Sequence, residues 1–124
     1  MVAVPSDPVI VRVPRDERCP DGCTSVHSYT SDGIRWCWQG ADPAREAIDV
    51  ELPTATPPAV GSRYDGDEDF WLVWTRLEVV AKLTNTPILV LVARGGLDRP
   101  APEDIAIEHV SIDGAIVALG RRLG

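Results

Sequence analysis

The sequence predicts an α+β domain in which one main helix packs on a mostly antiparallel sheet of six to seven short strands. Three observations support this prediction. Short runs rich in β-branched residues recur along the chain, residues 67–84 follow helical spacing, and turn-forming residues separate most runs. The expected order is ββββ-α-βββ. With 124 residues, 44% of them apolar, the chain has the size and composition of a single domain spanning residues 1–124.

Four strands are expected in the first half of the chain. Residues 8–14 form a short β run bounded by prolines, which favours a place at a sheet edge. Residues 25–39 are expected to form a hairpin around Ser31-Asp32-Gly33, and residues 47–52 alternate as a fourth strand. Residues 53–62 are rich in proline, and we expect a stiff, exposed connection there.

Residues 67–84 form the one helix that the sequence predicts. The acidic residues at 67–69 form its N-terminal end and Lys82 stands near its C-terminal end, in agreement with the helix dipole. Glu78 and Lys82 have the spacing of an intrahelical ion pair. The apolar surface is wider than a simple stripe, so the helix is expected at the centre of the domain or in an interface.

Three further strands are expected after the helix. Residues 88–93 are a continuous aliphatic run, which predicts a strand buried on both faces. Asp113-Gly114 separates the apolar runs 105–112 and 115–119, and this dipeptide is a strong signal for a two-residue hairpin loop.

The net charge of the chain is −7 at pH 7, which limits the kinds of partner to be expected. Such a surface repels phosphate backbones, so direct nucleic-acid binding is not expected, whereas a basic protein partner suits it. No run approaches the ~20 apolar residues that a membrane span needs. The N-terminal residues also lack the features of a signal peptide. The sequence therefore predicts a cytoplasmic protein that does not enter a membrane.

Three cysteines and one histidine lie within nineteen residues and are the candidates for a metal site. Their spacing, Cys-x3-Cys-x3-His-x9-Cys, permits a tetrahedral Cys₃His zinc site. In the cytosol, clustered thiols bind metal more often than they form disulfides. A hydrolytic zinc centre would in addition need an open coordination position and an acid such as Asp21 or Asp32. The four candidate ligands are Cys19, Cys23, His27 and Cys37.

The register of the hairpin decides whether two of these ligands meet. A two-residue loop puts His27 opposite Trp38 and places His27 and Cys37 on opposite faces. A three-residue loop puts His27 directly opposite Cys37. The first register separates apolar from polar residues more cleanly, so it is the predicted one. The cysteines and His27 are then expected to have a core or rim role, with zinc as the alternative.

The other polar clusters give no catalytic residue. Asp49 and Glu51 resemble the acidic half of a metal-dependent nuclease site, but the lysine usual two positions later is replaced by Pro53. Strand alternation predicts that both are solvated. Glu108 and His109 are neighbours on a strand and point to opposite faces, so they do not form an acid–base pair.

The expected function is that of a small acidic, non-enzymatic protein-binding domain of the inhibitor, immunity or assembly-subunit type. Aromatic residues on an acidic surface can anchor and steer a basic partner. Two alternatives stay open: a zinc-binding domain, structural or hydrolytic, and a structural subunit of a larger homo-oligomeric or virion assembly that makes contact through the helix or an edge strand. The candidate contact residues are Trp36, Trp38, Trp71 and Trp74.

Overall fold

The structure is a computed structural model of the chain, and it describes residues 8–14, 16–18, 26–53 and 59–124. The strands are β1 (Val9–Pro14), β2 (His27–Tyr29), β3 (Ile34–Gln39), β4 (Glu46–Glu51), β5 (Ile105–Ile112) and β6 (Ala115–Arg122). The helices are α1 (Phe70–Leu83) and α2 (Ile88–Ala93), with short 3₁₀ turns at Ala59–Arg63 and Gly96–Asp98.

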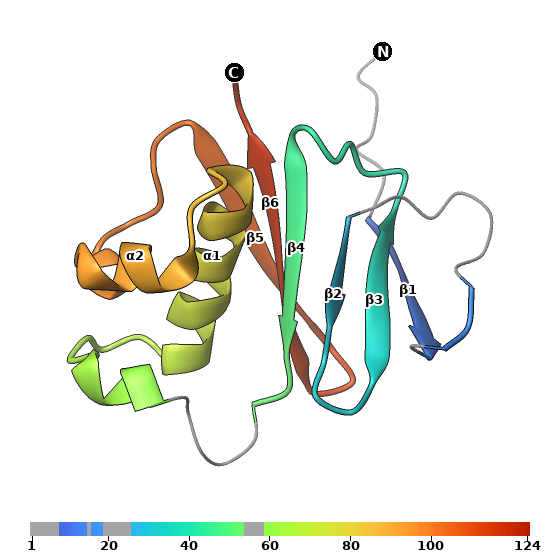
Figure 1. Cartoon of the computed structure of the whole chain (residues 1–124), viewed down its shortest axis with the longest axis horizontal. Coiled ribbons are helices and arrows are strands. Elements are labelled where there is room, and N and C mark those ends of the chain that lie inside the picture. Colours follow the sequence, from blue (N-terminus) through green and yellow to red (C-terminus); the bar gives the residue numbers. More distant parts are fainter. Residues whose placement is uncertain (1–7, 15, 19–25, 54–58) are drawn as a thin grey trace.

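The strands form two antiparallel sheets of three strands each, β1-β3-β2 and β4-β6-β5. In Figure 1 the helices cover one side of the β4-β6-β5 sheet, and the β1-β3-β2 sheet lies on its other side. One apolar cluster joins the two sheets and includes Trp36 and Trp38 of β3 with Ile48 and Val50 of β4. Two further clusters lie between the second sheet and α1, and between α1 and α2. The predicted α+β class is confirmed, with two sheets in place of one.

The first strand and the last hairpin form where the prolines and the turn residues of the sequence predict them. β1 pairs only with β3 and lies at the edge of its sheet, as its flanking prolines predict. β5 and β6 pair on either side of Asp113 and Gly114, whose φ angles of 49° and 83° belong to a two-residue hairpin loop. Arg12 of β1 forms an ion pair with Asp113 at 2.6 Å, which links the first sheet to this turn.

The β2–β3 hairpin has the three-residue loop, so the predicted register is wrong. His27 lies opposite Cys37 and not opposite Trp38. The amide of Thr30 donates to the Ile34 carbonyl at 3.0 Å across the loop, and Gly33 has a φ of 85°. This is the left-handed conformation that a three-residue loop with a bulge requires.

Buried hydroxyl groups explain why the polarity pattern failed. Ser28 and Thr30 are buried with the tryptophans and not exposed opposite them. The Thr30 hydroxyl accepts a hydrogen bond from the indole N–H of Trp36 at 3.1 Å, and the Ser28 hydroxyl accepts one from the backbone N–H of Val50 at 3.2 Å. Because these partners satisfy the hydroxyls, the face can be buried although it is partly polar.

Helix α1 confirms the predicted helix, but it begins at Phe70 and not at residue 67, so the acidic run lies just before its first turn. Asp69 is the N-cap residue, and its carboxylate accepts a hydrogen bond from the backbone N–H of Trp71 at 2.8 Å. At the other end the Thr84 amide donates to the Val80 carbonyl at 2.9 Å, and Asn85 with a φ of 50° leads the chain out of the helix.

Residues 88–93 form a helix and not the predicted buried strand. Pro87 is the N-cap residue, where its fixed φ leads into the first turn, and Gly95, with a φ of 81°, follows the C-cap Arg94 at the position where helices favour glycine. Leu89 and Val90 are 63% and 37% exposed, so the run is buried on one side only. Helix α2 packs on the cluster it shares with α1 through Ile88, Leu91 and Val92.

The proline-rich connection lies only partly within the described residues. Residues 59–63 form a 3₁₀ turn, and Val60 packs against the cluster between α1 and α2. The exposed character expected for the rest of the 53–62 segment stays a prediction. Among the residues that the structure describes, the longest helix is α1 with 14 residues, and no helix is long and apolar enough to cross a bilayer.

Candidate functional site

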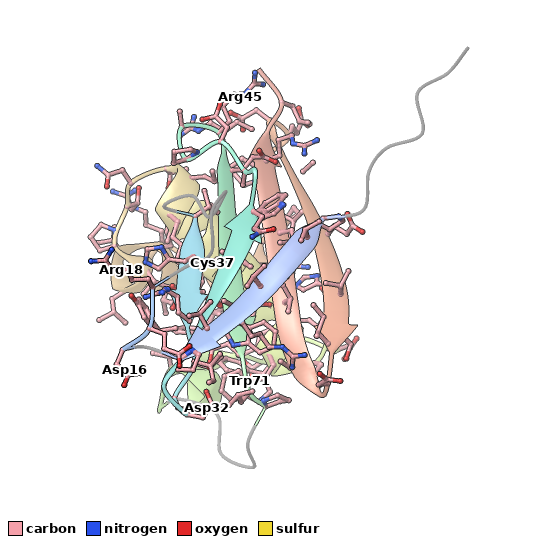
Figure 2. All side chains as sticks on the ribbon, turned by 90° about the vertical axis from the view of Figure 1, so that its right-hand side faces the viewer. Asp16, Arg18, Asp32, Cys37, Arg45 and Trp71 are labelled. Carbon is pink, nitrogen blue, oxygen red and sulfur yellow. The ribbon has the colours of Figure 1, made fainter. Side chains whose placement is uncertain are left out.

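The four tryptophans predicted to contact a partner have two different environments. Trp36, Trp38 and Trp74 are buried in the apolar clusters, with 3%, 8% and 8% exposure. Trp71, on the first turn of α1, is only partly buried. Figure 2 shows Trp71 at the same end of the molecule as the loop residue Asp32. Trp71 is therefore the tryptophan that the fold leaves accessible to a partner.

Carboxylates of β4 and α1 meet on the same flank of the helix as Trp71. Asp49 and Glu51 lie on the face of β4 turned toward α1, since alternate residues of a strand point the same way. Glu78 and Lys82 are one turn apart on α1. The Lys82 ammonium lies 3.5 Å from Asp49 Oδ1 and donates to the Ile48 carbonyl at 2.7 Å. We call Asp49, Glu51, Glu78 and Lys82 the acidic junction.

Asp49 is the most buried member of the acidic junction. Its residue is 5% exposed, and the Ser28 hydroxyl donates to its Oδ1 at 3.4 Å. Its Oδ2 is buried and has no hydrogen-bond partner in the described part of the chain. Burial raises the pKa of Asp49, while Lys82 and Ser28 pull it down. The prediction that Asp49 is a solvated strand residue is therefore wrong, and Glu51 is half-buried.

Burial and neighbouring carboxylates raise the pKa values of the two glutamates. The pKa of Glu51 is raised to about 7, first by burial and then by the charges of Asp49 and Glu78. The pKa of Glu78 is also raised to about 7 by burial and by Asp49. Lys82, the only lysine of the sequence, lowers both values and is the one cation shared by three acids. The junction therefore has a negative potential that one lysine does not neutralise.

Aromatic rings and further acids lie on the N-terminal side of the junction, at the start of α1. Phe70 lies edge-on to Trp71 with ring centroids 5.4 Å apart, and it stacks on Trp74 at 5.8 Å. Trp71, Glu78 and Lys82 follow one another along one stripe of the helix. A partly exposed indole therefore stands on this stripe at the N-terminal end of α1. The exposed acids at that end are Asp65, Asp67, Glu68 and Asp69.

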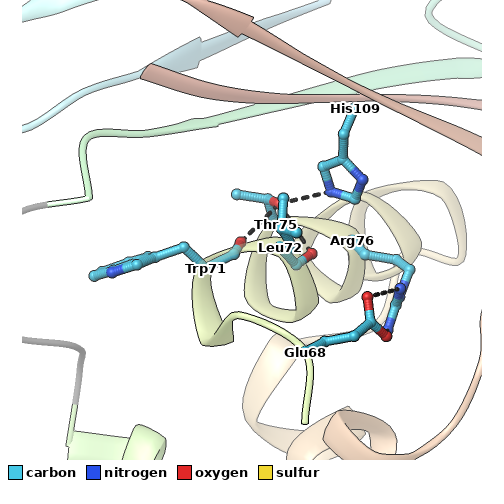
Figure 3. Close-up of polar contacts among 6 residues, drawn as sticks. All are labelled: Glu68, Trp71, Leu72, Thr75, Arg76 and His109. Carbon is cyan, nitrogen blue, oxygen red and sulfur yellow. Dashed lines mark hydrogen bonds and ion pairs between the residues drawn. The ribbon is translucent and has the colours of Figure 1, made fainter. Parts of the chain in front are cut away.

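His109 connects β5 to α1. Figure 3 shows its Nε2 facing the Thr75 hydroxyl, 3.0 Å away. The same hydroxyl donates to the Trp71 carbonyl at 2.9 Å. Burial and, after it, the Arg76 charge lower the pKa of His109, so the ring is neutral at pH 7. These contacts give His109 a structural role, which is to hold the first half of α1 against the sheet.

The observed hairpin register brings two of the four predicted zinc ligands together. His27 and Cys37 are direct cross-strand partners. Side chains at such positions have Cβ atoms ~5 Å apart, within reach of one ion. Cys37 is fully buried, and His27 makes an edge-on contact with Tyr29 at 5.3 Å between ring centroids.

The rest of the zinc site stays a prediction. Cys19, Cys23 and Asp21 lie outside the described residues, and Asp32 accepts a hydrogen bond from the Ile34 amide at 3.3 Å within the hairpin loop. Within residues 8–14, 16–18, 26–53 and 59–124, no three His, Cys, Asp or Glu side chains are grouped so that they could hold a metal ion.

No protein-family model matches the chain, and comparison with curated proteins and with solved structures gives no match. The proposal that follows therefore depends on the geometry and charge of the site.

Proposed function

We propose that the protein is a small, non-enzymatic protein-binding domain that receives a basic segment of a partner on Trp71 and the acidic junction. The observation that supports this proposal is the meeting of three carboxylates with a single lysine, on the flank of α1 whose helical stripe also carries the partly exposed Trp71. Asp49 gives the proposal further support, because its buried Oδ2 has no hydrogen-bond partner among the described residues.

A positive group of the partner would complete the charge balance of the junction. An ammonium or guanidinium near Glu51 and Glu78 favours their ionised forms, so binding would release protons. The Trp71 ring offers apolar contact and a cation–π surface to the same segment. The net charge of −7 increases the rate at which a basic partner is encountered.

Truncating Trp71 tests the proposal. A capped octa-arginine peptide, labelled for fluorescence anisotropy, is expected to bind the wild-type protein at low salt and more weakly at pH 5 than at pH 8, since protonated Glu51 and Glu78 attract it less. Trp71→Ala is expected to weaken binding by ~2 kcal/mol, or about 30-fold, with little change in folding stability.

Tyr29→Ala is the matched control for this experiment, because Tyr29 is 44% exposed and lies on β2, away from α1. It is expected to leave the affinity unchanged. Equal losses for both variants, or an affinity that does not change between pH 5 and pH 8, would contradict the proposed surface.

A structural zinc site is the second candidate, and the pairing of His27 with Cys37 favours it. In this case Cys19, Cys23, His27 and Cys37 would hold one Zn²⁺. Protein purified without a histidine tag is then expected to retain about one equivalent of zinc by elemental analysis, since structural zinc is tightly held. Cys37→Ser is expected to lose the metal. Less than ~0.2 equivalents in the wild-type protein would remove this candidate.

A further inference from the structure

A pocket of about 200 Å³ lies between α1, the C-terminal end of α2 and residues 99–102. Figure 1 shows α2 and the segment after it packed against α1 in this region. At 100° per residue, the α1 side chains of the pocket point away from the stripe that carries Glu78 and Lys82, so the pocket is separate from the acidic junction. Its apolar lining includes Val73, Leu77, Val80, Leu91 and Ala101.

The charged residues that line this pocket are all arginines: Arg76, Arg94 and Arg99. Arg76 is held by Glu68 at 3.2 Å, as Figure 3 shows. Arg94 and Arg99 are exposed, and neither guanidinium makes an ion pair or hydrogen bond with any residue in the part of the chain that the structure describes. Two arginines without an ion pair therefore stand beside an apolar pocket in a protein with a net charge of −7.

We propose that this pocket binds a small organic anion in which one carboxylate is joined to an apolar body of about six to eight carbons. The size follows from the volume, since a cavity of ~150 Å³ is large enough to hold a benzene ring. The charge follows from Arg94 and Arg99, because a guanidinium binds a carboxylate through two parallel hydrogen bonds. This proposal does not depend on the protein-binding function, which uses the other flank of α1.

Octanoate is a probe that has the required chemistry, and 1-octanol is its uncharged counterpart. Titration of octanoate into ¹⁵N-labelled protein is expected to give saturable amide shifts centred on Leu91, Gly96 and Ala101. Octanol is expected to bind the same residues about tenfold more weakly, since it lacks the charge-assisted hydrogen bonds. Arg94→Gln/Arg99→Gln is expected to reduce the affinity for octanoate about tenfold and to leave that for octanol unchanged.

Two further variants make the test specific. Arg18→Gln/Arg45→Gln changes the net charge by the same amount at arginines outside the pocket, which Figure 2 labels, and is expected to leave octanoate binding unchanged. Ala101→Phe fills the pocket and is expected to abolish binding of both probes. Three results would overturn the proposal: no saturable octanoate shifts, equal affinity for octanoate and octanol, or an equal loss in the two double-arginine variants.

Discussion

Replacing Lys82 with methionine is expected to lower the free energy of unfolding by about 3 kcal/mol at pH 8 and by about 1 kcal/mol at pH 5. Lys82 is the cation nearest to Asp49, whose side chain is 7% exposed, and it also donates to the Ile48 carbonyl. Removing one partner of a buried ion pair leaves the other charge uncompensated, and this is the main source of the loss. Because the Lys82 side chain is 38% exposed, we expect the lower end of the usual range.

The pH dependence follows from the raised pKa values of the junction. Glu51 and Glu78 have pKa values of about 7 in the folded protein, against an ordinary value of 4.5. A carboxyl with a raised pKa binds its proton more tightly in the folded state, so the free energy of unfolding falls as the pH rises from about 4.5 through about 7. Without Lys82 these pKa values rise further, and the loss grows toward pH 8. At pH 5 the glutamates are largely protonated in the folded state, and the pKa of Asp49, which burial raises, rises further without Lys82, so that Asp49 can take up a proton; the variant then loses mainly the hydrogen bond to Ile48.

Urea unfolding at the two pH values measures this difference, with Arg76→Met as the control on the same helix. Arg76 pairs with Glu68, which is 55% exposed, so its loss is expected to cost under ~1 kcal/mol at both pH values. Adding Glu51→Gln and Glu78→Gln to Lys82→Met is expected to restore part of the stability at pH 8. If Lys82→Met loses the same free energy at pH 5 and pH 8, the lysine acts through packing and not through the charges of the junction.

The sequence predicted those elements of the fold that local chemistry determines. Asp113-Gly114 predicted the β5–β6 hairpin because few residues other than glycine, asparagine and aspartate accept the positive φ angles of its loop. The acidic run predicted the start of α1 to within three residues, because its last member, Asp69, caps the first turn. In both cases the determining interaction lies within a few residues along the chain.

The aliphatic run at 88–93 was assigned to the wrong element because its pattern is ambiguous. Six consecutive apolar residues have neither the period of two of a strand nor a complete helical stripe, so periodicity does not distinguish the two. The fold selects the helix by packing one side of the run on α1 and leaving Leu89 and Val90 exposed. That choice depends on contacts with a helix earlier in the chain, which the run itself does not reveal.

The acidic junction could be predicted in part from its residues. Alternation along β4 correctly separates Asp49 and Glu51 from Ile48 and Val50, which pack between the sheets. The sequence did not show that α1 covers the face of β4 that carries Asp49 and Glu51. One signal was available, since Glu78 and Lys82 interrupt the apolar second half of the helix and Lys82 is the only lysine. A charged pair among apolar helix residues indicates charged or polar groups on the element that the helix packs against.

Which tryptophans are accessible could not be predicted from the local sequence either, because it depends on how elements distant in the chain pack together. Trp36 and Trp38 are two residues apart on β3 and face the second sheet, so their burial depends on how the two sheets pack. Trp71 and Trp74 share a helix, yet only Trp74 is buried in the cluster with Leu77. All four tryptophans were candidate partner contacts in the sequence, whereas the tertiary packing leaves Trp71 accessible.

Replacing Gly120 with valine is expected to destabilise the protein by about 3 kcal/mol, because this glycine sets the distance between α1 and the β4-β6-β5 sheet. Gly120 lies on β6 beneath α1, where a Cβ atom would overlap Val79 Cγ1 and lie 3.3 Å from Leu83 Cδ1. Val79 is fully buried, so its branched side chain has little room to move. The loss is measured by urea unfolding of the wild-type protein and the variant.

Val79→Ala supplies the matched second variant, since it removes the methyl groups that the new side chain meets. The double variant Gly120→Val/Val79→Ala is expected to be more stable than the sum of the two single losses implies, by at least ~1 kcal/mol. Val79 and Leu83 are neighbours of Glu78 and Lys82, so lifting α1 from β6 also moves Lys82 away from Ile48 and Asp49. Gly120→Val alone is therefore expected to weaken octa-arginine binding as well as stability. Strictly additive losses in the double variant would instead show that the helix does not press on the sheet at this position.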